Sequence, residues 1–251
     1  SAALLLAPPG LQAQEGSEAE DEDIQELSPF VVDSSEDVGY IATSTLAGTR
    51  LRTPLSDIGS AVSVYTEEFM EDIGAVDNET LLSYGLNTEV GGSRGNFVNP
   101  NNTGIENQNI AQPNNNTRIR GLTSADNTRN YFRTDIPWDG YNIDRVDVQR
   151  GANSILFGLG SPAGIINAST IEAGFHTRGK VGARYDQFGR VRGELDYNRS
   201  FLDDQVAVRV AAVYDQQEFR QEEAFEDDER YFASIKWAPN RFNNERTTFT
   251  V

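Results

Sequence analysis

The sequence predicts a mixed α+β domain followed by a series of long antiparallel β-strands. Between residues 60 and 170, short apolar strands alternate with short helices that carry recognisable caps and glycine stops. After about residue 178 the helical signals end, and apolar and polar residues alternate with a period of two. This change of pattern indicates two structural units in one chain.

The composition excludes several classes of protein. The 251 residues contain no cysteine and a single histidine, His176, so disulfide frameworks, thiolate metal sites, histidine-based zinc sites and Ser-His-Asp triads are not expected. The formal net charge of −18 disfavours a nucleic-acid partner, because binding to phosphates needs clustered lysine and arginine. No run of about 20 apolar residues predicts a membrane-spanning helix.

The first residues have the character of an export signal. An apolar run at residues 2–7 is broken by Pro8-Pro9-Gly10, and Ala13 offers a small residue at a cleavage site. We therefore interpret residues 1–14 as a signal-peptide remnant, and the chain as truncated at both ends. Residues 15–37 carry ten acidic residues and no basic ones, so this segment is expected to be disordered.

An apolar, β-prone hexamer lies within that acidic segment. Its residues are Leu27, Ser28, Pro29, Phe30, Val31 and Val32. The proline excludes a helix interior and favours an extended backbone. An exposed extended segment is suited to adding a strand to the sheet of a partner, but the residues alone equally allow the first strand of the folded domain.

The α+β domain begins with a strand and two short helices. A strand over residues 60–65 leads to a helix that Thr66 caps and Gly74 ends, and Asp77 caps a second helix that ends at Gly85. A polar loop follows over residues 91–116, with nine asparagines and no periodicity. Loops longer than ~12–15 residues are usually functional or disordered.

Later strands are expected at residues 117–121, 144–149 and 164–169, before the long alternating segments begin. Those segments cover residues 181–185, 191–201, 206–215 and 230–237, with a turn at Asp203-Asp204 and an acidic loop over residues 222–229. Such strands match a transmembrane β-barrel, although a soluble antiparallel sandwich also alternates. Charged faces, such as that of Arg192, Glu194 and Asp196, favour a polar lumen.

Residues 143–167 resemble the most diagnostic motif of the plug domain of TonB-dependent outer-membrane receptors. The motif comprises an Ile-Asp-Arg-Val-Asp-Val strand, Arg-Gly, a short serine-containing turn, Phe-Gly and a Gly-Ile-Ile-Asn strand. Ile119-Arg120-Gly121 and residues 60–85 match further blocks of the family in order and spacing. Ala152 and Phe157 depart from its usual proline and tyrosine, and Ile171 stands where a lysine commonly closes the plug.

The resemblance implies a fold and a domain organisation. We expect a plug, built as a small mixed sheet with short helices, at residues 38–174. The start of an antiparallel transmembrane β-barrel should follow at residues 175–251. A complete barrel would have about 22 strands, of which this chain would supply the first four or five.

The resemblance also implies roles for single residues. Leu27 to Val32 would form a TonB box that pairs with the energy-coupling protein TonB. Arg120 and Arg150, which are expected to end adjacent strand elements, would pair with glutamates on the inner barrel wall. The asparagine-rich loop would face an extracellular ligand, because amides both donate and accept hydrogen bonds. Its candidate residues are Asn96, Asn99, Asn101, Asn102, Asn107 and Asn109.

The implied function is energy-coupled import of a scarce ligand, of the siderophore, cobalamin or oligosaccharide class, across the bacterial outer membrane. The expected partners are TonB, outer-membrane lipid and the ligand, with a surface lipoprotein left open; no cofactor, metal, nucleic acid or catalytic residue is expected. One alternative is a secreted β-rich hydrolase, which would need two facing carboxylates ~5–9.5 Å apart. Another is a transporter that also signals, which the short segment before the TonB box disfavours.

Overall fold

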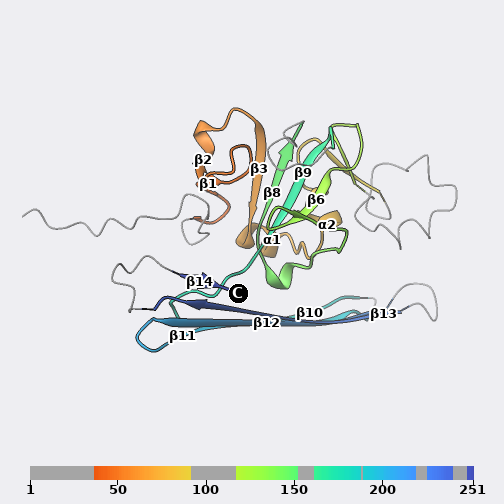
Figure 1. Cartoon of the computed structure of the whole chain (residues 1–251). Coiled ribbons are helices and arrows are strands. Elements are labelled where there is room, and N and C mark those ends of the chain that lie inside the picture. Colours follow the sequence, from red (N-terminus) through yellow and green to blue (C-terminus); the bar gives the residue numbers. More distant parts are fainter. Residues whose placement is uncertain (1–36, 92–116, 152–160, 188, 219–224, 240–247) are drawn as a thin grey trace, which may run out of the picture.

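The computed structural model describes residues 37–91, 117–151, 161–187, 189–218, 225–239 and 248–251. The described residues form two five-stranded sheets and two small two-stranded sheets. Figure 1 shows that the first large sheet and its helices stand over one face of the second, which is built from the long C-terminal strands. Among the described residues, no helix is long and apolar enough to cross a membrane.

The first large sheet is mixed, as the sequence predicts. Its strand order is β3-β8-β9-β6-β7, and β6 pairs with β9 in parallel while the other neighbours are antiparallel. The strands are β3 (Ala61–Thr66), β6 (Asp126–Arg129), β7 (Phe132–Arg133), β8 (Ile143–Arg150) and β9 (Gly164–Thr170). The small sheets pair β1 (Ser44–Thr45) with β2 (Thr53–Pro54), and β4 (Thr88–Val90) with β5 (Thr117–Ile119).

The helices are short and begin where their caps predict. The Thr66 hydroxyl accepts a hydrogen bond from the backbone N–H of Phe69 at 3.3 Å, at the start of α1 (Glu67–Asp72). A carboxylate oxygen of Asp77 accepts from the N–H of Thr80 at 2.6 Å, at the start of α2 (Asn78–Leu82). Each bond satisfies an N–H that the helix itself cannot pair. The described residues also form two 3-10 turns, η2 (Leu55–Asp57) and η4 (Gly140–Asn142).

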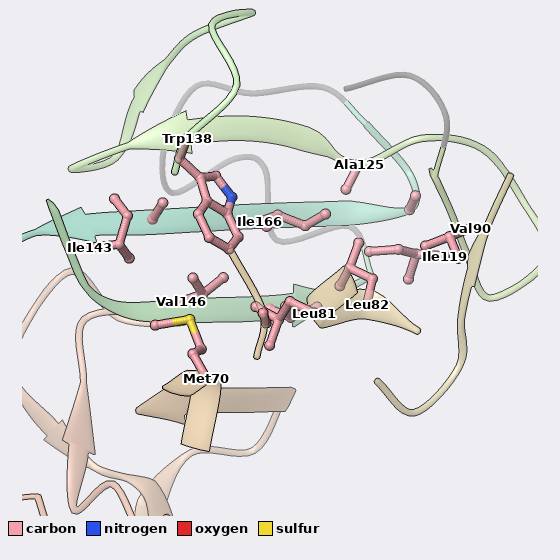
Figure 2. Packing of buried hydrophobic residues seen from close by; sticks show 14 residues of the cluster. Met70, Leu81, Leu82, Val90, Ile119, Ala125, Trp138, Ile143, Val146 and Ile166 are labelled. Carbon is pink, nitrogen blue, oxygen red and sulfur yellow. The ribbon is translucent and has the colours of Figure 1, made fainter. Parts of the chain in front are cut away.

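The core of this domain lies between the helices and the mixed sheet. Leu81 and Leu82 of α2 are fully buried against Val146 of β8 and Ile166 of β9, and Met70 of α1 closes the same cluster (Figure 2). Burying each large apolar side chain contributes about 1.5–3 kcal/mol. The short helices are therefore held mainly by this packing, because isolated helices of this length are not stable in water.

The second large sheet is antiparallel throughout, with strand order β10-β11-β12-β13-β14. Its five strands agree with the four or five that the start of the barrel was expected to supply. They are β10 (Arg178–Tyr185), β11 (Val191–Phe201), β12 (Val206–Glu218), β13 (Phe225–Trp237) and β14 (Phe249–Thr250). The tight turn between β11 and β12 lies where expected, with Leu202, Asp203 and Asp204 all at positive φ.

The two faces of this sheet are inverted relative to a soluble protein. Most of its large apolar side chains are exposed, with Val181 and Tyr231 at 80% and 78% of their full accessibility, while Arg192 and Asn198 on the other face are at 2% and 1%. An apolar outer face and a polar inner face are the pattern of a transmembrane β-barrel. The buried polar face is covered by the first domain (Figure 1).

One boundary prediction is wrong. Residues 225–229 of the acidic loop expected at 222–229 belong to β13 instead, which begins at Phe225 and includes the four acidic residues 226–229. These residues continue the backbone ladder with β12, from the pair Glu218–Phe225 to the pair Tyr214–Glu229. Ladder hydrogen bonds extend a strand regardless of side-chain polarity, so the apolar alternation detected only its second half.

Candidate functional site

The main polar contact between the two parts of the molecule is centred on Arg192 of β11. Its guanidinium forms two hydrogen bonds to the carboxylate of Asp139, at 2.9 Å from Nη1 and 2.5 Å from Nη2. Its Nη1 also donates to Asp215 at 2.8 Å and its Nε to Glu194 at 2.5 Å. One buried cation therefore holds one carboxylate of the first domain and two of the long strands.

Local structure fixes each of these groups. Asp139 caps η4, where its carboxylate accepts the backbone N–H of Tyr141 at 3.0 Å. Arg192 and Asp215 are direct cross-strand partners in the ladder of β11 and β12. Arg190, at the turn before β11, donates to Asp215 at 2.9 Å through Nε. The turn at η4 thus places Asp139 against Arg192, which is itself held in position by β11 and β12.

A second group of contacts joins α1 to β10. Glu67 lies 3.2 Å from the guanidinium of Arg178 and 3.3 Å from the ammonium of Lys180, which also pairs with Glu71. These side chains are 24–47% exposed, and exposed ion pairs contribute only about 0–1 kcal/mol. As at Arg192, the first domain supplies the acids and the long strands supply the cations.

A third group fixes the segment that joins the two domains. Asn198 of β11 donates to the carbonyls of Gly174, at 2.8 Å, and His176, and accepts the N–H of Gly174 at 3.0 Å. Ser234 accepts the N–H of Ala173 at 3.4 Å. Arg209 donates a hydrogen bond of 3.3 Å to the carbonyl of Glu172, the residue before Ala173. The connection is therefore attached to the strands through its backbone.

These contacts surround a charged pocket at the junction of α1, η4, β10 and β11. The first domain and the long strands both contribute polar groups to its wall. Its charged lining residues are Glu67, Glu71, Lys180, Arg184, Glu194, Asp196 and Arg209. The rest of the lining includes apolar side chains such as Met70, Ile143 and Leu195, so the two parts meet here through ion pairs beside apolar groups.

The start of the first domain is fixed by a separate buried pair. Asp37 pairs with Arg145 of β8, with side chains 8% and 3% exposed. Arg145 also donates to the carbonyl of Ser44 at 2.8 Å, and the hydroxyl of Thr45 donates to Asp147 of β8 at 2.8 Å. The chain between Asp37 and β1 is therefore held on the mixed sheet by charged and polar bonds.

Two groups beside this pair have shifted pKa values. Burial raises the pKa of Asp147 above its ordinary value of 3.8, an effect that Arg145 and the hydrogen bond from Thr45 offset only in part. Burial likewise raises the pKa of Tyr131 well above 10, and the negative charge of Asp147 adds to this shift. The charged form of Asp147 is therefore maintained at a cost to stability.

The two arginines singled out from the sequence, Arg120 and Arg150, meet at one open pocket. The expectation that they end adjacent strands is wrong, because β8 pairs with β3 and β9 while β5 pairs with β4. Arg150 donates to the carbonyl of Leu86 and the hydroxyl of Ser63, both at 2.9 Å. Arg120 follows β5 with a positive φ of 57°. Its guanidinium lies beside Gly151, 3.2 Å from the position that a Cβ atom would take if this residue had a side chain.

Other candidates lie outside the described residues. These are the hexamer Leu27 to Val32 and the asparagines at positions 96, 99, 101, 102, 107 and 109. Sequence reasoning assigned no contact to Asp139 or Asn198, and treated Arg192 only as part of a polar face. The available signal was the alternation itself, since a strand whose charged face carries Arg192 and Glu194 must meet polar groups on whatever covers it.

Comparison with known proteins decides the family. Residues 54–165 match the model of the TonB-dependent receptor plug domain. The chain carries the plug domain of a TonB-dependent receptor. That plug is the mixed sheet with its helices, and β10 to β14 are the antiparallel strands that begin the receptor's barrel. A ferrichrome relative is named an outer membrane transporter and a pyoverdine-binding neighbour an outer membrane receptor, and the chain is assigned to the same membrane.

Two curated relatives and one solved structure illustrate the relationship. A ferrioxamine receptor of Yersinia enterocolitica is 28% identical over 145 residues, which are 56% of this chain and 19% of the relative. A ferrichrome outer membrane transporter and phage receptor of Escherichia coli K12 is 29% identical over 126 residues, 50% of this chain and 16% of the relative. The pyoverdine-bound receptor FpvA of Pseudomonas aeruginosa shares the fold, with a TM-score of 0.69 and 20% identity over 86% of this chain and 30% of the receptor.

Proposed function

We propose that the full-length protein imports a ferric siderophore across the outer membrane, with energy supplied through TonB. The relatives named above are receptors for ferrioxamine and ferrichrome, and the structural neighbour binds pyoverdine. These names support a siderophore over the cobalamin and oligosaccharide classes that the sequence left open. The chain itself spans less than a third of those proteins, so the ligand is inferred for the whole receptor.

The observation that carries the proposal is the polarity of the contact between plug and barrel strands. Arg192 meets Asp139, and Lys180 meets Glu67, whereas the apolar core of the plug is contained within the plug. A domain joined by apolar packing exposes that surface to water when it moves. A domain joined by ion pairs exposes groups that water solvates well, so the plug can shift inside a wet lumen and return.

The proposed domain organisation follows the same logic. Residues 38–174 form the plug and residues 175–251 the first barrel strands, preceded by a signal remnant at 1–14 and an acidic segment at 15–37. Within that segment, Leu27 to Val32 act as the TonB box. Val32 precedes Asp37 by five residues, and Asp37 is bonded to β8 through Arg145, so a pull on the box reaches the plug sheet directly.

Arg120 and Arg150 are proposed to pair with glutamates of barrel strands that follow residue 251. Both line one open pocket on the plug, and arginine forms strong bidentate bonds with carboxylates. Glu89 lines the same pocket. The asparagine-rich loop is proposed to face the extracellular ligand, and outer-membrane lipid to contact the apolar face of β10 to β13.

Uptake by cells that carry the full-length receptor tests the proposal. Cells lacking the gene should lose uptake of radioactive iron supplied as ferrioxamine, ferrichrome or pyoverdine. Cells lacking TonB should show the same loss while still binding the ligand. Uptake that requires the receptor for cobalamin or an oligosaccharide, and for no iron chelate, would contradict the ligand class.

The TonB box has a matched control in the same segment. Val31→Pro removes an N–H that strand addition needs, so uptake should fall to the level of cells without TonB, while ligand binding persists. Glu20→Pro places the same residue outside the hexamer and should leave uptake unchanged. Equal effects of the two variants would place the TonB contact elsewhere.

A further inference from the structure

The buried cluster at Arg192 has more carboxylates than the plug contact requires. Asp139 comes from the plug, whereas Glu194 and Asp215 come from β11 and β12. On the barrel side, two cations, Arg190 and Arg192, face two anions, Glu194 and Asp215. The barrel side is therefore neutral by itself, and Asp139 is an additional anion.

The carboxylates of the two parts share one nitrogen of Arg192, and the two N–H groups on that nitrogen allow it to donate to both. Nη1 of Arg192 donates to Asp139 at 2.9 Å and to Asp215 at 2.8 Å. Nε is committed to Glu194 at 2.5 Å, while Nη2 faces Asp139 at 2.5 Å. The plug anion is thus bound by both terminal nitrogens of the guanidinium. Its five N–H groups are enough for all four of these contacts, so the carboxylates compete for the positive charge of Arg192 and not for a donor.

Separation of the plug leaves no unpaired charge within the barrel part of the Arg192 cluster. A buried pair is costly to break when the remaining charge has no partner. Arg192 retains Glu194 and Asp215 when Asp139 departs, and Asp139 retains the N–H of Tyr141. The contact is therefore strong while formed but does not impose the full cost of an orphaned charge when it opens.

We propose that Glu194 and Asp215 set how firmly the plug is held, by competing with Asp139 for Arg192. The contact acts as a releasable latch whose strength is adjusted from the barrel side. Fewer barrel carboxylates leave Arg192 with more uncompensated positive charge, and that charge binds Asp139 more tightly. This inference rests on the proposed movement of the plug and identifies positioning residues for it.

The other interface pairs differ from this cluster. Glu67 with Lys180 is a partly exposed pair, with side chains 24% and 35% exposed, whereas the Arg192 side chain is 1% exposed. Water screens the first contact whether or not the plug moves. The Arg192 contact is thus the one that a change in barrel charge should affect most.

Release of the plug can be measured by pulling on the full-length receptor held in a lipid bilayer. A handle attached upstream of residue 15 transmits the force, and the rate of plug extraction at constant force is recorded. Asp139→Asn should accelerate extraction at least tenfold, since asparagine still caps η4 but attracts the guanidinium weakly. Asp215→Asn and Glu194→Gln should each slow extraction severalfold.

The opposite signs separate competition from simple damage. Loss of packing or fold would accelerate extraction in every variant, so faster or unchanged extraction for both Asp215→Asn and Glu194→Gln would overturn the proposal. In the double variant Asp139→Asn/Asp215→Asn, the second substitution should no longer slow extraction relative to Asp139→Asn alone, because the plug carboxylate that Arg192 would bind more tightly is absent. Glu67→Gln is the matched interface control and should change the rate less than twofold.

The measurement uses neither TonB nor a siderophore. Failure of siderophore uptake would therefore leave the expected extraction rates intact. Conversely, correct uptake with extraction rates of the wrong sign would refute the latch alone.

Discussion

Removal of the Arg145 guanidinium should loosen the start of the plug. In Arg145→Met, the aliphatic stem remains, but Asp37 loses its ion-pair partner and the carbonyl of Ser44 loses a hydrogen bond. Breaking one side of a buried ion pair costs about 3–5 kcal/mol. Asp37 keeps the hydrogen bond that it accepts from the backbone N–H of Thr43 at 3.3 Å, so the lower limit of about 3 kcal/mol applies.

The assay is hydrogen exchange of the full-length receptor, read by mass spectrometry on peptides that cover β1 and β2. A loss of about 3 kcal/mol corresponds to more than a hundredfold faster exchange, since each 1.4 kcal/mol is about tenfold. Arg178→Met is the matched control, because Arg178 also pairs with a carboxylate but is 47% exposed. Its effect should stay below about 1 kcal/mol.

Two results would refute this reasoning. One is a change of less than about tenfold in Arg145→Met. The other is an equal change in Arg145→Met and Arg178→Met, which would mean that burial does not determine the strength of these pairs. Exchange in β12, far from Asp37, should remain at the wild-type rate in both variants and serves as an internal reference.

Three further predictions concern the plug, each read from its urea-unfolding midpoint in the full-length receptor. The pKa of Asp147 in the folded protein lies above its unfolded value of 3.8, so the native state binds the proton more tightly. The contribution of Asp147 to stability therefore falls as pH rises from about 4 through the raised pKa. Asp147→Asn should remove this pH dependence. Gly164→Ala places a Cβ 1.9 Å from the carbonyl oxygen of Gln149 and should cost more than about 4 kcal/mol, whereas Gly121→Ala, with φ +68 and no atom within 4 Å, should cost about 1–2 kcal/mol. Leu81→Ala empties a fully buried site and should cost about 3–5 kcal/mol; a loss below about 1 kcal/mol would show that the site collapses.

Local chemistry in the sequence was sufficient for the elements with strong signals. Thr66 and Asp77 act as the caps that their positions predict, and the alternation over residues 206–215 is the centre of β12. Elements of two to four residues, such as β1 and β7, were missed because so few residues carry no detectable period. The start of β13 was missed because charged residues can extend a backbone ladder.

The central contact could not be derived from the sequence because it joins distant residues. Asp139 and Arg192 are 53 residues apart, and alternation states which face of a strand is polar without stating what that face meets. Arg120 and Arg150 were identified by resemblance, yet their convergence on one pocket depends on how two separate sheets are placed. Tertiary pairing of this kind needs the structure.

The apolar face of β10 to β13 also has a consequence for biogenesis. Val181, Tyr185 and Tyr231 are each at least 78% exposed, and in water such a sheet face, with strand edges open to pairing, promotes aggregation. The plug covers the opposite face through ion pairs and hydrogen bonds, which also persist in water. We therefore expect the newly exported chain to need a chaperone that shields one side of these strands until lipid replaces it.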